Sequence, residues 1–439
     1  MEQPTQSHKR RRLGETPIHT TKNHAKQPHK CICGDIVVTP QRLLTPGYVH
    51  FDSDGMIILI SETPPASFQD FETAPILIPG HVDIHNHGVG GADDVVDYWN
   101  VPSYTLSRLA RVGTTSVIAT VVFPDDQQHE RSKTTCDALS ACVNQDGHGC
   151  VVRCIHAEGP VVATLGGLPD SSRQAAGSVE EFECLLNDIG EHLKIMTVAP
   201  SCDVQQNYAR LQMLSKRNVK ISLGHDKNCT EADIVGALRA VGPHHRCHMT
   251  HVFNVQQFHH RNSGLANFAL VSKFPQLAAF QDLTPPTVEV IGDFQHVSPM
   301  ALRALLGARG VNDICCITDA IAESIPGKRI KYSSDRLAEV SEDGQTVNIA
   351  GTTTLCGSCT SLHDTFRRLV DVLKVTLLEA VHVCSTTPSR IVGIDNEVGS
   401  LEIGKRGDLL MLDKDLNLLQ TVIGGRTVWD CDAPMVLST

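Results

Sequence analysis

Eight short apolar runs alternate with amphipathic stretches through the middle of the chain, and this repeat limits the possible fold more than any other feature. The runs predict strands at 81–87, 115–123, 151–158, 195–200, 220–225, 247–254, 287–293 and 314–319. Helical patterns lie between them at 103–112, 178–189, 230–241 and 299–308. Eight βα units over about 240 residues are typical of a closed parallel barrel. The sequence therefore predicts an α/β fold, a (β/α)8 TIM-like barrel.

The two ends of the chain lack this repeat. Residues 1–30 are polar and basic without hydrophobic periodicity, which predicts a disordered tail. Its basic run at 9–12 is a solvated charge cluster or, as the alternative, a nuclear-import signal. Strand-like segments return elsewhere at 32–60, 397–412 and 421–429. We expect a small β-sandwich domain formed by the N- and C-terminal segments 31–79 and 395–439, with the barrel over 80–394.

Composition excludes several classes of protein. The chain has 439 residues, 41% of them hydrophobic, so long disorder over most of it is excluded. No apolar run approaches the ~18 residues of a membrane helix, so we expect no membrane partner. The net charge of −11 argues against a nucleic-acid partner. The 16 cysteines are irregularly spaced and no signal peptide precedes them, which predicts reduced thiols and a cytoplasmic location.

Histidines and carboxylates fall at the ends of the predicted strands. They are His85 and His87 on the first strand, Glu158 on the third, His225 on the fifth, His251 on the sixth and Asp319 on the eighth. From His87 onward the separations are 71, 67, 26 and 68 residues. Because a βα unit has about 30–35 residues, these separations correspond to two, two, one and two units. All six side chains are therefore expected at the C-terminal face of the barrel, where active sites form.

These side chains have the chemistry of a metal centre. Imidazole and carboxylate groups suit Zn²⁺, Fe²⁺ or Mn²⁺, and an uncommitted carboxylate nearby provides a general base. Each part alone has a simpler explanation, since Glu158 could be a salt-bridge partner and Asp319 a helix N-cap. The joint spacing favours a site for one or two divalent ions, with Zn²⁺ expected first and Fe, Mn or Co as alternatives.

Four segments carry a family resemblance. They are Gly-His-Val-Asp-Ile-His-Asn-His (80–87), His-Ala-Glu-Gly-Pro (156–160), Thr-His-Val-Phe-Asn (250–254) and Gly-Ser-Leu-Glu-Ile-Gly-Lys-Arg-Gly-Asp (399–408). From about residue 31 onward the chain resembles the metal-dependent amidohydrolase superfamily, and within it the N-acetylglucosamine-6-phosphate deacetylase family. That resemblance implies hydrolysis of the acetamide of an N-acetylated amino sugar, by a homodimer.

The resemblance also implies roles for single residues. Glu158, His225 and His251 would hold the principal metal, and His85 and His87 could bind a second. Asp319 would deprotonate the attacking water and then protonate the departing amine.

Further roles concern the substrate. His296 would polarise the acetamide carbonyl. Asn254 and Arg261 would hold the sugar phosphate, with the arginine reaching across a dimer interface. Val255 stands among these substrate-binding positions in place of the family's usual alanine.

The sequence departs from the family pattern only around the substrate. Leu168 or Pro169 stands where the family has a histidine, Phe294 replaces a glycine, and 355–359 breaks the usual loop pattern. Two alternatives therefore stay open: an amidohydrolase acting on another N-acyl or cyclic amide, and a catalytically weak sugar-binding homologue. The intact Asp319 argues against the second.

Overall fold

The computed structural model describes residues 29–64, 71–90, 102–123, 126–147, 149–173, 177–333 and 336–433. Eight parallel strands form its central sheet, each paired with its neighbours in chain order. They are β6 (His81–Asn86), β7 (Thr114–Val122), β8 (Val151–Glu158), β9 (Leu193–Val198), β10 (Lys220–Leu223), β11 (His248–Met249), β12 (Thr287–Ile291) and β13 (Ile314–Ile317). The last and first strands meet where the Asp319 amide donates to the His85 carbonyl at 2.9 Å. The predicted (β/α)8 barrel is confirmed.

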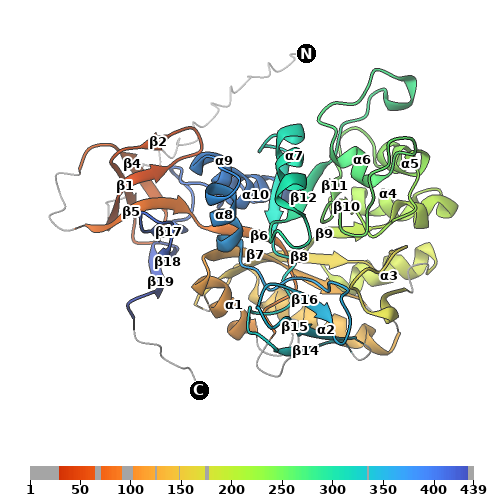
Figure 1. The fold of residues 1–439 in the computed structure, drawn as a ribbon, viewed down its shortest axis with the longest axis horizontal. Helices are drawn as coiled ribbons and strands as arrows, with labels where there is room; N and C mark the ends of the chain where they lie inside the picture. Colours follow the sequence, from red (N-terminus) through yellow and green to blue (C-terminus); the bar gives the residue numbers. More distant parts are fainter. Residues whose placement is uncertain are drawn as a thin grey trace, which may run out of the picture.

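Helices connect the strands and surround them (Figure 1). They are α1 (Pro102–Arg111), α2 (Asp126–Cys142), α3 (Val179–Ile189), α4 (Ala209–Lys216), α5 (Glu231–Val241), α6 (Leu265–Ala269), α7 (Pro299–Arg309), α8 (Leu362–Asp371), α9 (Leu377–Val381) and α10 (Thr387–Val392). A reciprocal capping box between Thr230 and Asp233 begins α5 and satisfies two free backbone amides. No helix in the described part of the chain has the length and apolarity to cross a membrane.

The interior of the barrel is partly polar. Nε2 of His156 lies 2.9 Å from the Thr197 hydroxyl, which lies 2.9 Å from that of Thr250. The Ser222 hydroxyl is 2.6 Å from Thr250, and all four side chains are fully buried. Because each of these polar groups has a partner, the network fixes the strands in register instead of destabilising the core.

Both ends of the chain contribute strands to a second sheet, seen at the left of Figure 1 in orange and blue. Its strands are β1 (Lys30–Val38), β2 (Leu43–Leu44), β3 (Gly47–Phe51), β4 (Ile57–Ser61), β5 (Glu72–Pro79), β17 (Leu409–Leu412), β18 (Leu418–Ile423) and β19 (Arg426–Asp430). In this sheet β5 pairs with both β1 and β17, and apolar side chains from both ends share one core. The expected small β domain from two chain ends is therefore present.

Some expectations about the ends differ from the structure or fall outside it. The strand expected at 397–412 is limited to Leu409–Leu412, because left-handed glycines at 399 and 404 place turns before it. Residues 1–28, most of the expected disordered tail, lie outside the described residues, and Lys30 already begins β1. The domain limits at 31–79, 80–394 and 395–439 stay a prediction.

A third sheet, which the sequence analysis did not expect, is inserted between β13 and α8. It is antiparallel and consists of β14 (Arg329–Ser333), β15 (Arg336–Val340) and β16 (Val347–Ile349). Ile330, Ala338, Val347 and Cys356 pack in a small core of its own. Its strands are three to five residues long, which is too short for their alternation of polar and apolar residues to predict a sheet.

Candidate metal and catalytic centre

The end of β8 places Glu158 against two histidines. Its Oε1 atom lies 2.9 Å from Nε2 of His225 and 3.0 Å from Nε2 of His251. The two imidazole nitrogens are themselves 3.0 Å apart. Ligands of one ion at about 2.0–2.2 Å stand about this far from one another. The three groups that the sequence analysis expected at the principal metal are therefore brought together, and all three are buried.

The same carboxylate also faces the other predicted histidines. Oε2 of Glu158 lies 3.1 Å from Nε2 of His87, and Oε1 lies 3.4 Å from Nε2 of His85. The Asp319 carboxylate is 3.4 Å from Nε2 of both histidines. These four residues form a second set of groups that could hold an ion, and Glu158 belongs to both sets.

Unusual backbone conformations turn several of these side chains into the mouth of the barrel. His225, His251 and Asp319 follow directly after their strands with φ angles of 50°, 25° and 51°. Left-handed backbone is unfavourable for residues other than glycine and costs of order 1–3 kcal/mol each. Such strain concentrates at functional sites, where the surrounding structure maintains it.

Hydrogen bonds orient the histidine rings. Nδ1 of His225 donates to the Thr164 carbonyl at 2.8 Å, which leaves Nε2 as the free ligand nitrogen. Nδ1 of His85 lies 2.7 Å from Oε1 of Glu289, whose other oxygen is 3.0 Å from Nε2 of His248. The sequence analysis missed Glu289. Its signal was a charged residue in the middle of an otherwise apolar strand.

The charge balance of the cluster fits a divalent cation. Burial alone would lower the pKa of His85, but Glu158, Glu289 and Asp319 outweigh it and raise that pKa well above its ordinary value. Burial would raise the pKa of Asp319, but His85 and His87 hold it below its ordinary range. Nε2 of His85 is buried and has no hydrogen-bond partner among the described residues. The buried carboxylates of Glu158 and Asp319 face this nitrogen, while Glu289 holds Nδ1 of the same ring, an arrangement that fits a divalent metal site.

Asn254 is a neighbour of the predicted metal ligands, whereas His296 is not among the residues that line their cavity. Asn254 lines a cavity of about 20 Å³ together with Glu158, Asp319 and other residues. Nδ1 of His296 is 2.7 Å from Oδ2 of Asp293, and its buried Nε2 is unpartnered within the described ranges. Burial would lower the pKa of His296, but Asp293 outweighs it and raises that pKa.

Val255 and Arg261 lie outside the lining of this cavity. Val255 packs against the neighbouring loop, since a Cβ atom added at Gly166 would stand 2.5 Å from its Cγ1. Arg261 is exposed in the 259–262 turn, where its amide donates to Nδ1 of His259.

Some of the departures from the family pattern line the cavity, whereas Phe294 and Val255 do not. Leu168, Leu355 and Gly357 are among its walls, as is Tyr332 from β14. The 355–359 segment also contains a Cys-x-x-Cys pair, Cys356 and Cys359, which was not recognised in the sequence. Burial raises the pKa of Cys356 to about 12 and that of Cys359 to about 11, so both stay protonated thiols at neutral pH.

Comparison with known proteins identifies the family. The model of the amidohydrolase family matches residues 76–428. The chain belongs to the amidohydrolase family. N-acetylglucosamine-6-phosphate deacetylase of Bacillus subtilis (strain 168) is 28% identical over 401 residues, covering 89% of this chain and 94% of the relative. N-acetylgalactosamine-6-phosphate deacetylase of Escherichia coli O157:H7 is 27% identical over 379 residues, covering 85% and 93%.

A solved structure gives the same result for the fold. N-acetyl-D-glucosamine-6-phosphate deacetylase from Mycobacterium smegmatis matches with a TM-score of 0.77 and 25% identity, covering 91% of this chain and 100% of that one. The amidohydrolase resemblance found in the sequence is thereby confirmed.

Proposed function

We propose that this chain hydrolyses the acetamide of N-acetylglucosamine 6-phosphate to give glucosamine 6-phosphate and acetate. The observation that carries the proposal is the position of Asp319. Its buried carboxylate lies 3.4 Å from His85 and His87, beside the cluster of Glu158 with two further histidines. A binding module has no need of such a base, whereas amide hydrolysis needs one.

The same cluster supports the assignment of a divalent metal. Glu158, His225 and His251 would hold the principal ion, and His85 and His87 would take part in a second site. The mixture of imidazole and carboxylate donors suits Zn²⁺ first, with Fe²⁺, Mn²⁺ or Co²⁺ as alternatives. Such an ion supplies Lewis acidity, which makes water acidic and polarises a carbonyl group.

The protein side chains account for the proton transfers. Asp319 takes a proton from water as the water oxygen bonds to the acetamide carbon. It returns that proton to the nitrogen as the carbon–nitrogen bond breaks, releasing the amine and acetate. Nε2 of His296, oriented by the bond from Nδ1 to Asp293, donates to the carbonyl oxygen as negative charge develops there.

A second candidate for the sugar has its own support. The relative from Escherichia coli O157:H7 acts, by its name, on the galactosamine epimer. The changed residues at 168 and 355 line the cavity, so the loop that would contact the sugar differs from the family pattern. N-acetylgalactosamine 6-phosphate is therefore the alternative substrate.

A substrate panel tests the proposal. The purified, metal-loaded protein is assayed for acetate release from both N-acetylhexosamine 6-phosphates, their unphosphorylated forms, an N-acetyl amino acid and a cyclic amide. We expect turnover to be fastest with N-acetylglucosamine 6-phosphate. Release from the amino acid or the cyclic amide alone would replace the sugar assignment, and release from none of the panel would favour a binding role.

The oligomeric state, cellular location and partners of the chain are also proposed here. We expect a homodimer, because the family resemblance implies that Arg261, which is exposed here, reaches across a dimer interface. Light scattering on the purified protein measures the mass directly. We further expect a cytoplasmic location and no nucleic-acid partner, the latter from the net charge of −11.

A further inference from the structure

One buried histidine that is not a candidate metal ligand, His248, links two strands of the barrel. It lies on β11 in register with Thr287 on β12, and Glu289 follows two residues further along β12. Alternate residues of a strand point to the same side, so Thr287 and Glu289 both face His248. Nε2 of His248 lies 3.0 Å from Oε2 of Glu289, and its Nδ1 lies 2.8 Å from the Thr287 hydroxyl.

Both ring nitrogens of His248 have a partner. A carboxylate only accepts hydrogen bonds, so Nε2 of His248 donates to Glu289. In the neutral ring Nδ1 then accepts from the Thr287 hydroxyl. These two bonds fix the tautomer and the orientation of the ring, and through the ring they fix Oε2 of Glu289.

The other oxygen of Glu289 reaches both sets of candidate metal ligands. Oε1 accepts from Nδ1 of His85 at 2.7 Å and from the amide of His251 at 3.2 Å. His85 belongs to the set with His87 and Asp319, whereas His251 belongs to the other set. One carboxylate therefore orients a histidine from each set.

Glu289 also supports an unfavourable turn of the backbone. His251 has a φ angle of 25°, a conformation that persists only where the surrounding structure maintains it. Its amide bonds to the Glu289 side chain, and the next amide, that of Val252, donates to the Glu289 carbonyl at 2.9 Å. A displacement of Glu289 would therefore release this turn and move the ring of His251.

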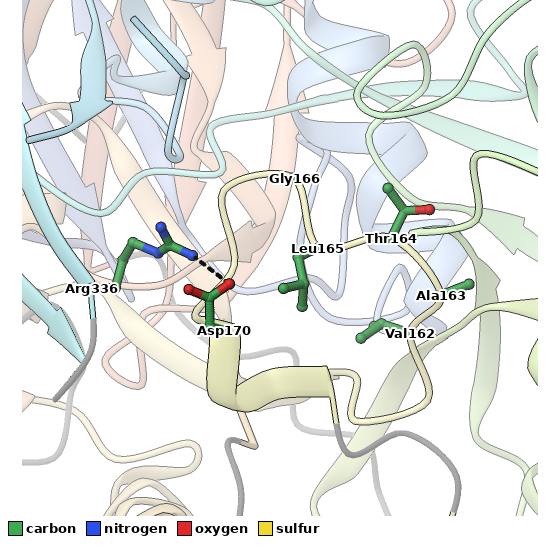
Figure 2. Close-up of a pocket in the computed structure, with 7 residues that line it drawn as sticks. All are labelled: Val162, Ala163, Thr164, Leu165, Gly166, Asp170 and Arg336. Carbon is green, nitrogen blue, oxygen red and sulfur yellow. Dashed lines mark ion pairs between the residues drawn. The ribbon is translucent and has the colours of Figure 1, made fainter. Parts of the chain in front are cut away.

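Burial distinguishes this pair from the charged pair in Figure 2. There the Arg336 guanidinium lies 3.5 Å from Asp170, whose side chain is 68% exposed, so water and salt screen the pair. The side chains of His248 and Glu289 have no exposed surface. Removal of His248 would leave a carboxylate oxygen buried without a donor, which costs far more than the loss of an exposed contact.

We propose that His248 is a positioning residue of the metal centre, an inference that rests on the metal site of the proposed function. His248 fixes Oε2 of Glu289, so that Oε1 holds Nδ1 of His85 and the amide of His251 at the same time. It is not a ligand itself and acts only through the carboxylate. The two candidate ion positions thereby share one support below the ligands.

The Zn²⁺ affinities of His248→Leu and His248→Gln, measured by competition with a chelator, test this role. Leucine has no atom that donates to Glu289, so we expect the affinity to fall about 10-fold. Glutamine places an amide N–H near the position of Nε2 and should keep the affinity within about 3-fold of the wild type. His363→Leu is the matched control, because His363 is a buried histidine bonded to His81 and to the Leu416 carbonyl at the opposite end of the barrel. It should bind Zn²⁺ as the wild type does.

A double-mutant cycle with Glu289→Gln separates positioning from a general loss of packing. If His248 acts through Glu289, His248→Leu has little further effect on the Zn²⁺ affinity once Glu289→Gln is present. Additive losses would overturn the proposal, as would a wild-type affinity in His248→Leu or an equal loss in His363→Leu.

A milder variant keeps the test valid if His248→Leu does not fold. Thr287→Val removes only the partner of Nδ1, so we expect the Zn²⁺ affinity to fall about 2- to 5-fold. An unchanged affinity in this variant would contradict the proposed support of the ring.

The absorption spectrum of bound Co²⁺ gives a readout that does not depend on turnover. Its visible bands respond to the geometry of the ligands, so they should change in His248→Leu and keep the wild-type form in His248→Gln and His363→Leu. An unchanged spectrum in His248→Leu would overturn the proposal. If the wild type binds Co²⁺ but releases no acetate from any substrate, the proposed hydrolysis fails while the role of His248 stands. If the wild type binds no ion, the metal centre and the role of His248 fail together.

Discussion

The catalytic cluster and the loops that face the substrate are built from different parts of the molecule. The cluster residues Glu158, His225 and His251 lie at the ends of barrel strands, so strand register fixes their positions. The wall of the cavity beside the cluster comes instead from loops and the inserted sheet, with Gly167 and Leu168 after β8 and Tyr332 on β14. The first region matches the family pattern, whereas the second departs from it. We therefore expect the barrel strands to determine the reaction and the loops to determine the substrate specificity.

The largest effect is expected from the base in the first region. Asp319→Asn keeps the size of the side chain but cannot accept a proton, so we expect kcat to fall about 100- to 10,000-fold. The ion expected at Glu158, His225 and His251 should stay bound, so the metal content, measured by mass spectrometry, should not fall below one ion per chain. Asp343→Asn is the control. Asp343 is an exposed carboxylate in the turn between β15 and β16, and its replacement by a carboxamide should have no effect on turnover. Unchanged turnover in Asp319→Asn would remove the proposed base.

A smaller effect is expected from the residue that orients a cluster histidine. Glu289→Gln weakens the 2.7 Å contact to Nδ1 of His85, and such orienting contacts account for about 10- to 100-fold in metal affinity or activity. Competition with a chelator measures the affinity. Glu339→Gln on β15 is the matched control. If both variants bind metal as the wild type does, Glu289 has no role beyond packing.

The substrate-facing region should respond in KM without changing the metal. Leu168→Ala removes a buried side chain from the cavity wall, which weakens a sugar contact by about 1–2 kcal/mol, or roughly 5- to 30-fold in KM. Metal content and the kcat for the best substrate should stay within a few-fold of the wild type. A loss of metal in Leu168→Ala would show that the two regions are not separable.

The last prediction concerns the stability of the protein at the opposite, N-terminal end of the barrel, where two buried histidines lie in contact. Nε2 of His81 lies 3.2 Å from Nδ1 of His363, and burial lowers the pKa of both below 6.5. As pH falls below about 6.5 the unfolded chain takes up protons that the folded chain does not. The free energy of unfolding should then fall by up to about 1.4 kcal/mol per pH unit for each histidine.

Urea unfolding of the metal-free protein at pH 7.5, 6.5 and 5.5 measures this dependence without the metal's own proton linkage. His363→Gln should flatten the slope between pH 6.5 and 5.5, because one of the two depressed histidines is gone. Parallel curves for the variant and the wild type would show that the pair does not contribute to the acid sensitivity.

The sequence was sufficient for the barrel and for the convergence of its strand-end residues. The βα repeat sets the register, so the positions of Glu158, His225 and Asp319 followed from spacing alone. Glu289 was missed because its role depends on a contact with His85 on a distant strand, which spacing does not reveal. Tyr332 of the cavity wall was missed because β14 has only five residues, too few for its alternation to predict a sheet or to place it beside the barrel.

The most direct test of metal-dependent deacetylation is the removal and return of the metal. Chelated protein is titrated with Zn²⁺, and bound metal and acetate release from N-acetylglucosamine 6-phosphate are measured on the same samples. We expect no activity without metal and a rise in proportion to the metal bound, ending at one or two ions per chain. Full activity in the metal-free protein, or metal binding without any acetate release, would contradict it.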